Sequence, residues 1–132
     1  DVCKRGSIAV VTTTTRMLLP RSPEDVDVVI TATELSAAQD LLREAIDKGC
    51  SRLALVTGSE DSAHGTRVVG VPAEWVPELV GPGLGDVVVV EADGSRKLPF
   101  KAPRAPSEPV LPLGVEAVTA VCGIDCLGAS IC

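Results

Sequence analysis

Two acidic residues at the end of an apolar run are the first candidates for chemistry in this chain. Residues 87–90 are four consecutive valines, and Glu91 and Asp93 follow them directly. If the strand stays extended to its end, both carboxylates point to the same side. Carboxylates at the carboxyl end of a strand suit the binding of hydrated Mg²⁺ or the positioning of a water molecule. The alternative is that they are the polar residues with which any buried strand ends.

Basic residues follow the two acids. No acid lies between Asp93 and Glu108, and four of the twelve Lys and Arg residues fall within residues 96–104. Guanidinium and ammonium groups form charge-assisted hydrogen bonds to oxyanions, so this segment suits phosphate or another anionic group. The alternative is a solvated loop that owes its charges to exposure. The four residues are Arg96, Lys97, Lys101 and Arg104.

The other reactive residue types are sparse. The five cysteines are an odd number and too few for a disulfide framework. Cys122, Cys126 and Cys132 form one cluster, which lacks a close Cys-x2-Cys pair and a neighbouring histidine. We expect buried or end-of-chain thiols, with a metal or redox site as the alternative. The single histidine, His64, lies in a polar segment, and we expect it on the surface.

The elements that would position these residues alternate between strand and helix. Four β-branched valines suit a strand covered on both faces, as in the centre of a parallel sheet. In residues 36–48 the apolar side chains recur at three- and four-residue steps, which predicts a helix with Ser36 and Gln39 as a capping box. A helix followed closely by a strand is typical of parallel sheets. We expect strands at 8–11, continued by the threonines at 12–15, and at 27–31, 52–57, 66–71, 87–90 and 117–122, a polar loop at 58–65, one or two helical turns at 72–80, and an extended, proline-rich connection at 99–112.

Composition narrows the class of protein. A chain of 132 residues predicts a single domain, here of the α/β class. The formal charge of −6 and the scarcity of aromatic residues argue against a nucleic acid partner. No apolar stretch approaches the roughly 20 residues of a membrane span, and no secretory signal is visible. We therefore expect no membrane association and a cytoplasmic location.

Five segments resemble, in the same order and spacing, the motifs of the YqeC-like accessory proteins of selenium-dependent molybdenum hydroxylases. Together they span residues 8–128, nearly the whole chain. The acidic segment followed by Lys-Ala-Pro is the most specific of them. The segments are Thr-Thr-Thr-Thr-Arg-Met at 12–17, Glu-Ala-Asp-Gly-Ser-Arg at 91–96, Lys-Ala-Pro at 101–103, Glu-Pro-Val-Leu-Pro at 108–112 and Gly-Ile-Asp-Cys-Leu-Gly at 123–128.

The resemblance implies a P-loop-type nucleotide-binding fold: a three-layer α/β domain with a mostly parallel sheet and flanking helices. Residues 1–132 would be the central part of a longer domain of this kind. Glu91 and Asp93 would lie near Mg²⁺ and the γ-phosphate of ATP or GTP, as the metal-binding and catalytic acids. Hydroxyl groups of Thr13 and Thr14 would approach the same metal or phosphate. Further contacts to the nucleotide would come from Arg16, Ser95, Arg96, Lys101 and Glu108.

The chain departs from the family pattern in one respect. Family members carry a Gly-rich G-x-G-G-K-T-T loop before the threonine strand, and this sequence contains none. The glycine-rich residues 81–85 cannot replace it, because they precede a strand and include Pro82, which has no N–H donor. We therefore expect little or no nucleotide turnover by this chain alone. A sheet edge exposed by a missing strand would favour a homodimer.

Two functions from different classes remain open, with a third reading beside them. The first is an accessory protein in maturation of a selenium-dependent molybdenum hydroxylase, which binds and hydrolyses a nucleoside triphosphate in the full-length parent. Its partners would be the hydroxylase or its maturation proteins. The second is a non-catalytic scaffold module that recognises an anionic cofactor or a partner protein through residues 96–104. The third is a structural fragment whose acids only hold loop geometry.

Overall fold

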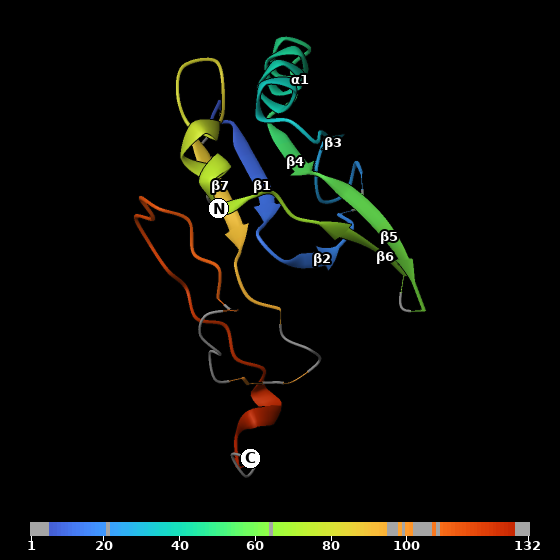
Figure 1. Cartoon of the computed structure of the whole chain (residues 1–132), viewed down its shortest axis with the longest axis vertical. Helices are drawn as coiled ribbons and strands as arrows, with labels where there is room; N and C mark the ends of the chain where they lie inside the picture. Colours follow the sequence, from blue (N-terminus) through green and yellow to red (C-terminus); the bar gives the residue numbers. More distant parts are fainter. Residues whose placement is uncertain are drawn as a thin grey trace.

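The described part of the chain forms two sheets, one α-helix and two short three-ten helices (Figure 1). The computed structural model describes residues 6–20, 22–63, 65–94, 98, 100–101, 107 and 109–128. The α/β class predicted from the sequence is confirmed. The elements are β1 (Ala9–Thr13), β2 (Arg16–Leu18), β3 (Val28–Thr31), α1 (Leu35–Asp47), β4 (Arg52–Val56), β5 (Gly58–Ser62), β6 (Gly65–Val69), η1 (Ala73–Leu79), β7 (Val87–Glu91) and η2 (Ile124–Cys126).

Four strands form a parallel sheet in the order β3-β4-β1-β7. The remaining three form an antiparallel sheet in the order β2-β6-β5. β1 therefore lies between two neighbours, and β7 lies at one edge of the parallel sheet. In Figure 1, β1 and β7 run side by side in the same direction.

The two faces of the parallel sheet are covered differently. Val10 and Leu55 point to the face that packs against Leu42 of α1 and Leu79 of η1, and all four side chains are fully buried. On the other face, Val56 packs against Met17 and Val68 of the small sheet. α1 and η1 therefore lie on one face of the parallel sheet, and the antiparallel sheet lies over the other.

The valine strand β7 is less covered than we predicted. Val88 and Val90 pack against the helix-covered core, but Val89 on the opposite face is 45% exposed. The prediction of coverage on both faces is therefore wrong. The prediction of a central strand is also wrong, because no described strand pairs with the outer edge of β7. Residues 117–122, which we expected as a last strand, have no regular secondary structure and are exposed.

Two local predictions are also corrected. Residues 58–62 are not a loop but strand β5, which pairs with β6 in a hairpin. The capping box at the start of α1 is absent: Glu34 is the N-cap residue and makes no side-chain cap bond. Gln39 instead donates to the carbonyl oxygen of Glu78 at 2.8 Å, which ties α1 to η1. The predicted helical turns at 72–80 are confirmed as η1.

The reactive residues outside the acidic segment do not form a site where they are described. Cys50, Cys122 and Cys126 are free thiols, of which Cys122 is exposed. His64, Cys3 and Cys132 lie outside the described residues. Of the helices that the structure describes, none has both the length and the apolar character needed to pass through a membrane.

Candidate functional site

The parallel pairing of β1 with β7 brings the threonine and acidic segments together. The register aligns Thr13 with Glu91, so both strands end at the same edge of the sheet. The Thr13 hydroxyl donates to the carbonyl oxygen of Glu91 at 2.8 Å, and the Thr14 N–H donates to the same oxygen at 3.1 Å. Sequence reasoning expected these two segments to meet, and the structure places them side by side.

The threonine hydroxyl groups are engaged within the protein. Thr13 is fully buried, and its hydroxyl also accepts a hydrogen bond from the N–H of Thr15 at 3.0 Å. The Thr14 hydroxyl donates to the carbonyl oxygen of Val110 at 2.7 Å, while the Val110 N–H donates to Ala92. These bonds hold residues 109–112 against the ends of β1 and β7. A direct contact of Thr13 or Thr14 with a metal or phosphate stays a prediction.

The two acids lie close enough to influence each other. Burial raises the pKa of the Glu91 carboxyl above its ordinary value, and the negative charge of Asp93 raises that pKa further. Glu91 is exposed as a whole residue, so the surrounding protein removes its carboxyl group from water only in part.

Asp93 is paired with a basic residue from the following segment. Lys101 Nζ lies 2.6 Å from Asp93 Oδ1 and also donates to the carbonyl oxygen of Gly94. The Lys101 side chain is 14% exposed and that of Asp93 is 35% exposed. Ion pairs with limited exposure are screened less than pairs on the open surface. Two of the predicted site residues, Asp93 and Lys101, are therefore in direct contact.

The other residues that we predicted to contact the nucleotide lie away from Asp93 and Lys101 or outside the described part of the chain. Arg16 pairs with Glu60 of the small sheet, with Nε 3.2 Å from Oε2, and its side chain is 58% exposed. Its role in nucleotide binding stays a prediction. Ser95, Arg96 and Glu108 lie outside the described residues, as do Lys97 and Arg104.

Backbone groups complete the site and were not predicted from the sequence. The carbonyl oxygens of Gly94, Ala92 and Val110 each accept one of the bonds that hold the segment after β7. Every residue carries a carbonyl group, so no residue type could have signalled this role. The only available hint was the high proline content of residues 99–112, which predicts few bonds within that segment itself.

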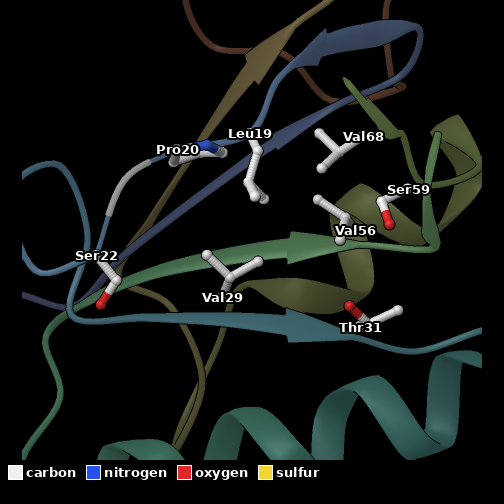
Figure 2. A pocket seen from close by; sticks show the side chains of 8 residues that line it. All are labelled: Leu19, Pro20, Ser22, Val29, Thr31, Val56, Ser59 and Val68. Atoms are coloured by element: carbon white, nitrogen blue, oxygen red, sulfur yellow. The ribbon is translucent and has the colours of Figure 1, made fainter. Parts of the chain in front are cut away.

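A hollow of about 520 Å³ lies away from these groups (Figure 2). Its described lining comes from β3, β4, the small sheet and the segment that follows β2, near the β3 edge of the parallel sheet and away from β7. None of the described residues that line it carries a charged side chain. The lining residues are Leu19, Pro20, Ser22, Val29, Thr31, Val56, Ser59 and Val68.

The oxygen atoms at these strand ends are of the type that binds Mg²⁺, and a bound Mg²⁺ stays a prediction. In the part of the chain that the structure describes, no group of three or more His, Cys, Asp or Glu side chains could hold a metal by itself. Mg²⁺ is commonly held by one or two carboxylates, with the other positions taken by water and substrate phosphate. Glu91, Asp93 and the Gly94 carbonyl group supply oxygen ligands of that kind.

Comparison with known proteins identifies the family. The family model described as "YqeC protein" matches residues 1–132. "Uncharacterized protein YqeC" of Escherichia coli (strain K12) is 41% identical over 69 residues, which are 52% of this chain and 27% of that protein. The match thus spans about a quarter of this relative's length. No solved structure matches the chain. The family model covers the whole sequence, and the chain therefore belongs to the YqeC protein family.

Proposed function

We propose that this chain forms the metal-binding side of a nucleotide site, in a protein that binds and hydrolyses a nucleoside triphosphate with Mg²⁺. The observation that carries the proposal is the contact of Asp93 with Lys101, directly after Glu91 at the carboxyl edge of a parallel sheet. Ligands of open α/β sheets bind at that edge. The role in maturation of a selenium-dependent molybdenum hydroxylase rests on the family resemblance of the motifs.

Each group has a distinct task in this proposal. Asp93 is the direct ligand of Mg²⁺, because its carboxylate lies beside the Gly94 carbonyl group. Glu91, whose pKa is raised, is suited to accept a proton from the attacking water. Lys101 supplies positive charge to the phosphate oxygens. Phosphoryl transfer to water depends mainly on such positioning and charge neutralisation.

The nucleotide base and the cradle for the β- and γ-phosphates are not assigned to this chain. Its sequence contains no G-x-G-G-K-T-T loop, whose backbone N–H groups and lysine hold these phosphates. We therefore expect this chain alone to bind Mg²⁺–ATP or Mg²⁺–GTP weakly. A form of the protein that contains such a loop should bind one of them at least tenfold more tightly.

Calorimetry with the Asp93→Asn variant tests the proposal. Loss of the carboxylate charge should weaken Mg²⁺–nucleotide binding by tenfold or more in the full-length protein, since a charged ligand contributes more than a neutral amide. Asp47→Asn, which changes an exposed carboxylate at the end of α1, is the matched control and should bind normally. If the full-length protein binds neither nucleotide, or if Asp93→Asn binds as the wild type does, the proposed function is wrong.

One observation favours a second function. Lys101 already neutralises Asp93, and the hydroxyl protons of Thr13 and Thr14 are already donated to carbonyl groups. This arrangement needs no metal, and it also suits a scaffold that recognises an anionic cofactor or partner. The two functions differ in their response to EDTA, because binding to a scaffold of this kind would persist after all Mg²⁺ is removed.

A further inference from the structure

Lys101 places its ammonium group on the oxygen atoms that a metal ion would use. Its Nζ contacts Asp93 Oδ1 at 2.6 Å and the carbonyl oxygen of Gly94. A carboxylate oxygen beside a backbone carbonyl oxygen is a ligand combination typical of hard divalent cations. In the described structure, this position is thus filled by a cation that is covalently part of the chain.

We propose that Lys101 is a tethered counter-cation, which keeps Asp93 closed to a divalent metal until a phosphate group arrives. This inference rests on the proposed function, because it requires a phosphate-bearing ligand. An ammonium group and a divalent ion cannot both contact the same carboxylate oxygen without strong repulsion. Lys101 must therefore leave Asp93 when a metal binds there. A phosphate oxygen next to the metal gives the ammonium group a new partner of similar strength.

The exchange makes the binding of metal and phosphate cooperative. A metal that binds alone has to break the pair between Lys101 and Asp93. A metal that binds together with phosphate restores a charge-assisted bond to Lys101. By linkage, phosphate must then raise the affinity for metal by the same factor by which metal raises the affinity for phosphate.

The limited exposure of the pair makes the effect measurable. Lys101 and Asp93 are 14% and 35% exposed, whereas Lys48 and Glu44 on α1 form a pair of equal length, 2.6 Å, with 68% and 59% exposure. Exposed pairs of this second kind contribute little free energy. The chain therefore offers a matched control with the same residue type and the same distance, but without the site.

The experiment measures Mn²⁺ binding by electron paramagnetic resonance, with and without ATP, in the full-length protein. ATP should raise the Mn²⁺ affinity of the wild type about tenfold. Lys101→Met should bind Mn²⁺ alone about tenfold more tightly than the wild type, and ATP should then raise its affinity less than threefold. Lys101→Arg retains the cation and should behave like the wild type, as should Lys48→Met.

The outcomes separate this inference from the proposed function. If ATP and Mn²⁺ bind the wild type but Lys101→Met leaves the affinity for Mn²⁺ alone unchanged, Lys101 does not restrain Asp93 and the inference is overturned. If no form binds ATP with Mn²⁺, the proposed function fails. In that case, tighter binding of Mn²⁺ alone by Lys101→Met would still support Lys101 as a counter-cation at Asp93. Should Lys101→Met fail to fold, Lys101→Gln provides the same comparison.

Discussion

The negatively charged form of Glu91 is less stable in the folded protein than in the unfolded chain. Burial and the neighbouring Asp93 both favour the protonated form and raise the pKa of this carboxyl. The folded state therefore binds a proton more tightly than the unfolded state does. The stability contributed by the protonated form is present at low pH and is lost as the pH rises from the ordinary glutamate range through the raised pKa.

Glu91→Gln should consequently stabilise the metal-free protein above that range. The gain should be a few tenths of a kcal/mol, because the residue is exposed overall. Urea denaturation at several pH values between 4 and 8 measures it, and the variant should show a flatter dependence of stability on pH than the wild type. Identical pH dependence in the two proteins would show that Glu91 titrates in the same range in both states. The same substitution should lower any nucleotide hydrolysis.

At the residue scale, side-chain alternation predicts that Glu91 and Asp93 point to the same side, because the strand stays extended to Glu91. The ion pair between Asp93 and Lys101 could have been predicted from the sequence, since the two residues lie in adjacent motifs. Arg16 pairs with Glu60, which is distant in sequence, and that contact depends on how β2 and β5 are placed by β6. No local pattern contains such information.

At the scale of elements, the end of β1 is held by a close approach of the chain after β6. Gly70 donates its N–H to the Thr15 carbonyl oxygen at 3.0 Å, and Val71 donates to that of Thr13 at 2.8 Å. A Cβ atom on Gly70 would lie 2.0 Å from the Thr13 carbonyl oxygen. Only a residue without a side chain fits between these two segments. The position of the threonines beside Glu91 thus depends on a glycine outside every motif.

Gly70→Ala should destabilise the protein by about 3 kcal/mol, because backbone atoms must move to relieve the contact. Chemical denaturation provides the measurement. Gly58→Ala is a suitable control, since a Cβ atom at Gly58 would meet nothing within 4 Å. We expect that control to change stability by less than about 1 kcal/mol. An equal effect of both substitutions would show that the approach at Thr13 is not tight.

The elements that were predicted correctly share a strong local pattern. β1, β3 and β4 are apolar runs that end in polar residues, and α1 has apolar side chains at helical spacing. β5 was missed because a strand in an exposed hairpin needs no apolar side chains. The apolar residues 117–122 were wrongly predicted as a strand, because pairing requires a neighbour that the sequence does not identify. Apolar character alone could not place β7 at the edge either.

At the scale of the whole molecule, apolar side chains gather in the C-terminal part. Seven of the fourteen large hydrophobic side chains that are exposed among the described residues lie between Leu111 and Leu127. Val121 is 87% exposed and Leu113 is 83% exposed. Exposed apolar side chains that gather in one part of a protein commonly mark an interaction site. Because the outer edge of β7 also has no described partner strand, we propose a homodimer as the assembly that covers this region.

Val121→Asp should weaken self-association about a hundredfold, since each of the two copies loses the burial of one such side chain, which contributes about 1.5 kcal/mol. Sedimentation equilibrium measures the dissociation constant. The formal charge of −6 on each copy opposes association, so the dimer should be tighter at higher salt. Leu18→Asp, at a residue that is 61% exposed on β2, should leave the dissociation constant unchanged. A wild-type chain that stays monomeric at high concentration would contradict the homodimer.

The pairing of β1 on both sides has a consequence for how this segment tolerates changes in length. Its register is specified twice, by Val10 opposite Leu53 of β4 and by Thr13 opposite Glu91 of β7. An insertion or deletion of one residue within the strand would rotate every later side chain to the other face. Thr13 would then turn towards the helices, and the hydrogen bond from the Thr12 hydroxyl to the carbonyl oxygen of Leu55 would be lost. Spacing within this run is therefore as tightly constrained as its chemistry.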